Sequence, residues 1–349
     1  MKSIWFVIAA LMLHGCGQEP QDASPPPAAP VEKSAASGVE APAASAAPAP
    51  PAERVYAEAT VAMELAQVSP HVYYAMGAPG TATDNQGFIS NAGVIITDDG
   101  VVVLDGLGTP SLAEKLLGLI REKTDQPIRY AIVTHYHADH IYGLQVFQDA
   151  GAKIIAPRGA DAYLAAANAE TRLNERRTSL FPWVDERTRL VVPDEYIDGE
   201  RELTVGGVTL RLEYLGAAHS DGDLSLYVLP DKVLFTGDLI FEGRIPFVGD
   251  AETRQWLATL QRLEQEQPAA LVPGHGPAAR DPVASVRGTR EYLAYLREQL
   301  GVAVANFTPF DEAFDAIDWS AFEKLPAFAE AHRRNAYQVY LALEAEGFE

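Results

Sequence analysis

The chain has 349 residues, and its 27 Lys and Arg stand against 48 Asp and Glu, for a formal net charge of −21. Contact with phosphate backbones draws its free energy from Lys and Arg that release counterions, so this charge argues against a nucleic acid partner. Cys16 is the only cysteine in the sequence, which excludes an internal disulfide and a cysteine-ligated zinc site.

Residues 1–16 have the pattern of a secretory signal that ends in a lipid attachment site. Lys2 precedes the apolar run 4–13, and a helix of about ten residues spans only about half of the ~30 Å hydrocarbon core, so we expect no permanent membrane helix. The run ends in Leu-His-Gly-Cys16, which resembles a bacterial lipobox; an ordinary signal with an incidental cysteine is the alternative. Gly17 after the cysteine resembles lipoproteins sorted to the outer membrane. We therefore expect a lipoprotein anchored through Cys16 in a bacterial envelope and facing the periplasm.

Residues 17–54 consist mainly of Ala and Pro with scattered Ser, Glu and Gln. Such a composition cannot bury a core, and its prolines favour extended polyproline II. We expect a semi-stiff tether between the membrane and the folded part. A binding role for the Pro-rich run is the alternative.

The first half of the folded part alternates predicted strands and helices. Residues 55–74 and 87–105 contain short β-rich runs, with a hairpin at Asp98-Asp99-Gly100. Residues 111–123 have helical spacing, with Ser111 as the expected N-cap. The remaining elements of this half are a strand over 128–134, a helix from Leu144, a strand over 153–156 and a helix over 161–168.

The second half repeats this βα style. We expect strands over 208–214, 224–229, 233–236 and 270–272, and helices over 252–266 and 283–300. Helices outside two packed sheets would leave the strand ends exposed along one edge.

Two segments fall outside that plan. The charged segment 170–198 contains Phe-Pro-Trp183, so it either arches over the site and offers Trp183 as an aromatic wall to substrate, or packs on its own domain as an exposed lid. The chain from Pro309 onward has two predicted helices, which we interpret as a small cap with Tyr337 and Tyr340 in packing roles.

Residues 135–140 read His-Tyr-His-Ala-Asp-His and follow the apolar strand 128–134. Imidazole nitrogen and carboxylate oxygen suit Zn²⁺ and also Fe or Mn, and His135 and His137 in an extended loop can converge on one ion. Asp139 and His140 then remain for a second ion. A polar loop with solvated histidines is the alternative.

The other histidines argue against a solvated loop. Three of the eight histidines lie in this hexapeptide, while His219 and His275 occupy comparable strand-end positions, and Asp238 ends the apolar stretch 232–236. Seven ligand-type side chains at the ends of predicted strands indicate a metal centre rather than an accident of composition.

This order of motifs resembles the metallo-β-lactamase superfamily over approximately residues 63–290. The resemblance implies a four-layer αββα sandwich, which would be the catalytic domain at 55–305, followed by a helical cap at 306–349. It implies two divalent ions, most simply Zn, with His135, His137 and His219 on one, Asp139, His140 and His275 on the other, and Asp238 as the bridge. Asp105 matches a position whose carboxylate usually accepts a hydrogen bond from the ligand loop; an Asp that opens a turn is the alternative.

The resemblance also implies a hydrolase that uses a metal-bound hydroxide, which Asp139 would orient as the catalytic carboxylate. β-Lactamases of the superfamily carry cysteine or serine where this chain has Asp238, whereas glyoxalase II-like thioesterases, lactonases and sulfur dioxygenases carry aspartate. The stretch 237–246, Trp256 and the late segment 332–340 look most like sulfur-oxidation and quinoprotein-relay hydrolases. We therefore expect a small acyl substrate such as a thioester, with β-lactam hydrolysis, iron-dependent sulfur dioxygenation and a non-catalytic metal-binding envelope factor as alternatives.

Arg244 lies shortly after Asp238 in the sequence. We hypothesise that it binds a substrate carboxylate. An ordinary surface salt bridge is the alternative.

Overall fold

The computed structural model describes residues 55–249 and 251–347. The predicted signal peptide, the tether and the lipidation site at Cys16 lie outside the described residues.

The first sheet combines an antiparallel and a parallel half. Its order is β1-β2-β3-β4-β5-β6-β7, with antiparallel pairing from β1 to β4 and parallel pairing from β4 to β7. The central strands are continuous apolar runs because both faces of the sheet are covered. The strands are β1 (Ala66–Gln67), β2 (Val72–Ala75), β3 (Ala92–Thr97), β4 (Gly100–Leu104), β5 (Ile128–Ile132), β6 (Lys153–Pro157) and β7 (Glu195–Ile197).

The second sheet has the order β12-β11-β10-β9-β8, and only β11 and β12 pair in parallel. Strand β8 was not predicted from the sequence. Charged residues fill its first three positions, so its apolar pattern is weak, and only the last residue, Val205, is fully buried. The strands are β8 (Glu200–Val205), β9 (Val208–Gly216), β10 (Asp223–Val228), β11 (Val233–Phe241) and β12 (Ala270–His275).

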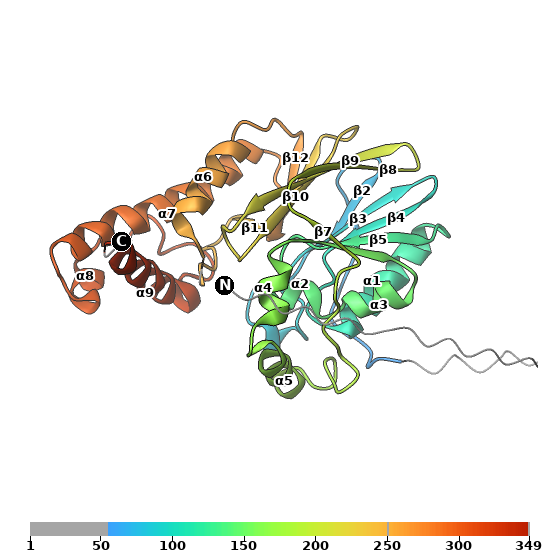
Figure 1. Cartoon of the computed structure of the whole chain (residues 1–349), viewed down its shortest axis with the longest axis horizontal. Coiled ribbons are helices and arrows are strands. Elements are labelled where there is room, and N and C mark those ends of the chain that lie inside the picture. The colour runs from blue at the N-terminus through green and yellow to red at the C-terminus, as the bar shows by residue number, and fades with distance from the viewer. Residues whose placement is uncertain (1–54, 250, 348–349) are drawn as a thin grey trace, which may run out of the picture. The chain divides into compact units, whose positions relative to one another are not determined.

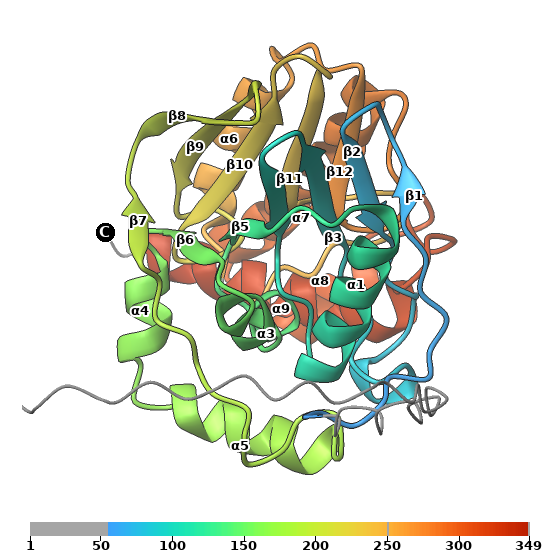
Figure 2. The same ribbon diagram turned by 90° about the vertical axis from the view of Figure 1, so that its right-hand side faces the viewer.

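Three apolar cores separate four layers, so the predicted αββα sandwich is confirmed. Residues of both sheets, such as Ile95 and Leu226, fill the core between them. Helices α1 and α3 cover the outer face of the first sheet, and α6 and α7 cover the second (Figures 1 and 2). The helices of the sandwich are α1 (Pro110–Lys123), α2 (Ala138–Ile141), α3 (Leu144–Asp149), α4 (Ala160–Ala165), α5 (Ala169–Ser179), α6 (Thr253–Leu263) and α7 (Pro282–Ala305), with a 3-10 turn η1 (Ala82–Asp84).

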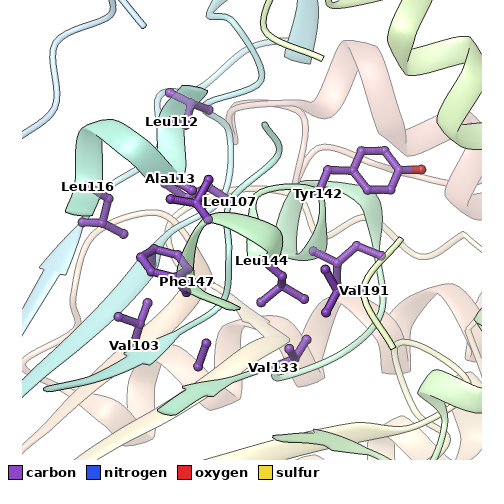
Figure 3. Packing of buried hydrophobic residues seen from close by; sticks show 14 of the residues in the cluster. Val103, Leu107, Leu112, Ala113, Leu116, Val133, Tyr142, Leu144, Phe147 and Val191 are labelled. Carbon is purple, nitrogen blue, oxygen red and sulfur yellow. The ribbon is translucent and has the colours of Figure 1, made fainter. Parts of the chain in front are cut away.

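Figure 3 shows the outer core of the first sheet at close range. Leu116 of α1 lies near Phe147 of α3 and Val103 of β4, and all three side chains are buried. The predicted cap of α1 was wrong: the Thr109 side chain accepts from Leu112 N at 3.2 Å and Pro110 takes the first helical position, so Ser111 already lies inside the helix.

Other differences concern boundaries. The segment 170–198 is not a simple arch, because it carries most of α5 and the edge strand β7. The helix predicted over 161–168 ends three residues early at Ala165, and the predicted helix 283–300 extends to Ala305. Strand β11 runs on to Phe241, so Asp238 lies within a strand rather than after it.

The C-terminal cap consists of α8 (Phe310–Ala316) and α9 (Phe328–Glu346), which pack against α7 (Figure 1). Tyr340 is 7% exposed and donates to Thr308 O at 2.9 Å. None of the helices in the described residues is both long and apolar enough to cross a membrane.

Asp231, in the turn between β10 and β11, connects the two sheets. Its carboxylate accepts hydrogen bonds from Ser69 Oγ, from His71 N at 3.0 Å and from His71 Nδ1 at 2.7 Å. Both donor residues lie in the turn before β2. Burial would raise the pKa of Asp231, but the hydrogen bonds from Ser69 and His71 outweigh burial and hold the pKa below its usual value.

We expect Asp231→Asn to lower the free energy of unfolding by about 1–2 kcal/mol at pH 7, because charged acceptors make the stronger hydrogen bonds. A depressed carboxylate pKa stabilises the fold above the unfolded value of about 4, and the stabilisation is lost as pH falls through the folded pKa. Urea unfolding with EDTA present should therefore show wild type and variant converging below pH ~4. Asp99→Asn, on an exposed hairpin, is the matched control. A difference that stays constant with pH would contradict this role.

Candidate metal centre

Four of the predicted ligands follow β5: His135 and His137 lie in the loop after the strand, and Asp139 and His140 lie in the short helix α2. Strand β5 ends at Ile132, and the chain then stays extended through His137 before α2 begins at Ala138. His135 and His140 are fully buried, while Asp139 in the first turn of α2 is half-buried.

The structure brings all seven predicted ligands together from four places in the sequence. Three groups have ligand atoms that lie within 4.8 Å of one another: His135 with His137 and His219, Asp139 with His140 and His275, and His135 with His140 and Asp238. The first two groups are the two ligand sets that the sequence resemblance implies, and the third places Asp238 between them.

Asp238 touches both sets. Its Oδ2 lies 3.4 Å from His219 Nε2 and 3.2 Å from His275 Nε2, and its Oδ1 lies 3.3 Å from His140 Nε2. The carboxylate is 4% exposed. A single buried carboxylate is therefore in reach of two cations.

Two glycines make room for Asp238. Gly237 has φ of 51°, which breaks the regular register of β11 against β12 just before the carboxylate. A Cβ on Gly274 would overlap the Asp238 side chain. The position of Asp238 therefore depends on the positive φ of Gly237 and on the absence of a side chain at Gly274.

The donor set fits a pair of divalent cations. His135 Nε2, His140 Nε2 and Asp238 Oδ1 are buried and have no hydrogen-bond partner in the described residues. His219 Nε2 and His137 Nδ1 lie 3.0 Å apart, close to the roughly 3.3 Å between neighbouring nitrogens around a tetrahedral zinc ion. Orphaned ligand atoms at this spacing indicate cation binding rather than internal hydrogen bonding.

Electrostatics divides the cluster into neutral imidazoles and ionised carboxylates. Burial lowers the pKa of His219 to about 3 and also lowers the pKa of His135 and of His137, so these three present lone pairs at neutral pH.

The carboxylates of Asp139 and Asp238 stabilise positive charge on the neighbouring imidazoles of His140 and His275. Burial acts against ionisation, yet His140 and His275 hold the pKa of Asp139 and of Asp238 below the usual range. In turn, and against burial, the carboxylates raise the pKa of His275 to about 9 and raise that of His140. Divalent cations would displace these protons.

Asp105 orients His140 and the loop before it. Its Oδ2 lies 2.9 Å from His140 Nδ1, while its Oδ1 accepts from Thr134 N at 2.8 Å. The bond to Nδ1 leaves Nε2 of His140 as the ligand atom. Asp105 has φ of 61°, a conformation that Asp and Asn tolerate better than most residues.

Sequence reasoning missed the segment before β3. His275 Nδ1 donates to Ile89 O at 2.7 Å, Ser90 Oγ donates to Asp139 O at 2.6 Å, and Asn91 Nδ2 donates to Pro273 O and Gly276 O, each at 2.8 Å. These bonds fix a ligand strand of one sheet to the other sheet. No local pattern could have revealed partners 182 and 185 residues away.

Asp223 was also missed, although it lies only four residues after His219, in His-Ser-Asp-Gly-Asp223. Its Oδ2 accepts from Ala218 N at 3.1 Å and from Ser220 N at 3.0 Å, so it shapes the turn that carries His219. An Asp a few residues after the start of a turn often stabilises that turn through its side chain, and this pattern could have identified Asp223 from the sequence.

Two buried aromatic rings pack against the candidate ligands. Trp256 lies edge-on to His219 at 5.2 Å, and Phe241 stacks on His275 at 5.1 Å.

The two predicted substrate residues lie in different surroundings. Arg244 is half-buried and is close enough to Asp238 and Asp139 for both to favour its charge. Trp183 donates its indole N–H to Glu58 O at 3.2 Å, so its polar edge is held by the segment before β1.

Comparison with known proteins agrees with this geometry. The profile of the Metallo-beta-lactamase superfamily matches residues 85–275, a range that contains all seven ligand residues. The chain belongs to this superfamily.

Similar superfamily proteins have varied names. A Caenorhabditis elegans protein named "Beta-lactamase-like protein 2 homolog" is 24% identical over 207 residues, 56% of this chain and 62% of that protein. The "Metallo-beta-lactamase type 2" of Bacteroides fragilis is 22% identical over 192 residues, 54% of this chain and 69% of that protein. This chain thus spans less than two thirds of the worm protein.

Two solved superfamily structures share the fold. A metallo-beta-lactamase from Pontibacter korlensis has a TM-score of 0.54 at 22% identity and covers 67% of this chain and 99% of its own. The sec-alkylsulfatase Pisa1 from Pseudomonas sp. has a TM-score of 0.62 at 21% identity and covers 80% of this chain and 50% of its own.

We expect Asp105→Asn to weaken metal binding roughly 10-fold or more, because an amide cannot accept from both Thr134 and His140. Asparagine keeps the shape and tolerates the positive φ. Competition with a chromophoric chelator measures the affinity, and Asp99→Asn serves as the control for loss of a charge. Unchanged metal affinity in Asp105→Asn would contradict its role in orienting His140.

Proposed function

We propose that this protein is a dinuclear metallohydrolase that cleaves a thioester or a related acyl compound. The observation that carries the proposal is the pair of ligand sets with the Asp238 carboxylate between them. Zinc is the proposed metal, and the same donors also suit Fe or Mn.

Each carboxylate has a distinct task in this reaction. Two ions held here would supply an activated water nucleophile and polarise the acyl carbonyl. Asp139 is held through its backbone carbonyl by Ser90 and orients the nucleophile. Asp238 sets the separation of the two ligand sets. A thiolate leaving group requires no protonation by a protein residue.

The substrate class rests on Asp238. Superfamily β-lactamases carry cysteine or serine at this position, whereas glyoxalase II-like thioesterases carry aspartate. The closeness to glyoxalase II-like, sulfur-oxidation and quinoprotein-relay hydrolases is part of the proposal. Residues 1–54 support the further proposal that the enzyme works in a bacterial envelope, anchored through Cys16.

A sulfate ester is a second candidate substrate. The solved alkylsulfatase covers more of this chain than the solved β-lactamase does, 80% against 67%. The half-buried Arg244 beside the ligand carboxylates would suit the charge of a sulfate ester.

A substrate panel tests the ranking. We expect the zinc-loaded full chain to cleave an S-acyl glutathione thioester with kcat/KM at least 100-fold above that for a cephalosporin or an alkyl sulfate. Fast cephalosporin cleavage would instead favour a β-lactamase, and oxygen consumption with iron would favour a sulfur dioxygenase.

Removal of the ligand carboxylates tests the mechanism. We expect Asp139→Ala and Asp238→Ala to lower kcat/KM by several hundred-fold or more, because both nucleophile and metal are disturbed. EDTA should abolish turnover and added Zn²⁺ should restore it in wild type only. Asp185→Ala, which removes a surface salt bridge to Arg187, is the control. Cellular function that survives loss of both ligands in a folded protein would favour a non-catalytic metal-binding factor.

A further inference from the structure

The first described residues run past the segment that follows α5. Trp183 donates its indole N–H to Glu58 O at 3.2 Å, and the guanidinium carbon of Arg187 lies 5.9 Å from the centre of the Tyr56 ring. Figures 1 and 2 both show the blue start of the described chain beside this green segment. The sequence that leads back to Cys16 therefore joins the folded part next to Trp183.

An exposed apolar tip lies at this junction. Phe181 is 68% exposed, and Pro182 after it is exposed as well. Leu180 and Val184, on either side of the tip, are buried. Buried neighbours on both sides fix the backbone of the tip, so the Phe181 ring projects outward from a defined place in the fold.

Val55 extends the apolar surface across the junction, since its side chain is 55% exposed. The arginines nearby do not make the surface strongly basic, because Arg187 is paired with Asp185 and Arg177 with Glu170. We call this surface the exit face, and it consists of Val55, Tyr56, Phe181, Pro182 and Trp183. It offers aromatic and aliphatic groups rather than a strong charge.

A lipid surface fits the exit face better than a second copy of the chain does. Aromatic rings with one polar edge are typical of the membrane–water interface, where they lie at the level of the headgroups. A second copy would bring together two chains that each carry a net charge of −21. Phe307 is more exposed still, at 90%, but it lies in the turn between α7 and α8, apart from the start of the described chain (Figure 1).

The tether makes a weak contact sufficient. Polyproline II rises ~3.1 Å per residue, so residues 17–54 would hold the folded part within roughly 120 Å of a lipid at Cys16. Confinement raises the effective concentration of the bilayer at the exit face, to which the tether is joined. A contact too weak to hold a free protein on a membrane would therefore persist in the anchored protein.

We propose that the exit face docks on a phospholipid bilayer, with Phe181 and Trp183 among the headgroups. The proposal rests on that part of the proposed function which anchors the chain at Cys16, and it is independent of the substrate. Leu180, next to Phe181, lines one small cavity together with Asp139. Docking would therefore also set the distance between the bilayer and the metal centre.

Quenching of tryptophan by brominated lipids tests the contact. Because Cys16 is the only cysteine, the chain from Cys16 onward can be coupled to a maleimide lipid in phosphatidylcholine vesicles, whether or not cells lipidate it. We expect vesicles brominated near the headgroup end of the acyl chain to quench the coupled protein roughly threefold more than the same protein left uncoupled. Trp183→Phe should remove most of this excess, whereas Trp256 is fully buried.

Two phenylalanine variants separate the exit face from exposed rings in general. We expect Phe181→Ser to lower the excess quenching of Trp183 about threefold or more, because the ring that enters the interface is lost. Phe307→Ser removes an even more exposed ring from the cap and should keep the wild-type value. A roughly tenfold rise in salt should change the quenching little, since the contact is apolar rather than ionic.

Hydrogen exchange of the amides around Phe181, measured on the same vesicles, identifies another occupant. Protection that grows with protein density while quenching stays absent would show that a second copy covers the face, and it would overturn the proposal. Equal quenching in wild type and Phe181→Ser, or none in wild type, would overturn it as well.

The lipid anchor is tested separately by the mass of the chain purified from cells. An unmodified Cys16 with quenching retained on maleimide lipid counts against the proposed anchor alone. An acylated Cys16 without quenching counts against docking alone.

Discussion

The buried Asp238 carboxylate and the five imidazoles around the centre set the main physical constraint on this molecule. Charges and orphaned ligand atoms this deep are costly unless cations compensate them. This constraint explains why a glycine and hydrogen-bonding side chains occupy positions next to the centre. Gly274 leaves space for the carboxylate, and Asp105 bonds to His140 Nδ1 so that Nε2 faces the centre.

Both sheets contribute ligands, so the centre depends on how the sheets are joined. The loop after β5 and the strands β11 and β12 meet at one edge. Asn91 fixes this edge by bonding across to the β12 backbone, and Asp231 joins the sheets at another pair of turns. Side-chain packing between the sheets supplies most of the association, while these few polar ties set the register of the ligands.

The C-terminal cap extends the site beyond the superfamily core. Its α9 bonds to the loop that carries Arg244, and Trp319 and Phe328 pack against His332 of the same helix. Closely packed interiors are not continuously deformable, so a fixed Asn335 limits the positions open to the loop. The loop after β11 is thereby linked to residues far from it in the sequence.

The sequence alone determined the layers and identified the seven candidate ligands that the fold brings together, because apolar periodicity and a dense His and Asp motif are local signals. It also singled out Asp105, which contacts the ligand loop through Thr134 and His140. Only the tertiary structure decided which atoms meet: the position of Asp238 between the two ligand sets, the role of Asn91, and the link from Asn335 to the Arg244 loop. The Asn335 and Asn91 contacts join residues 87 and 182 positions apart, and no pattern within one helix or strand encodes them.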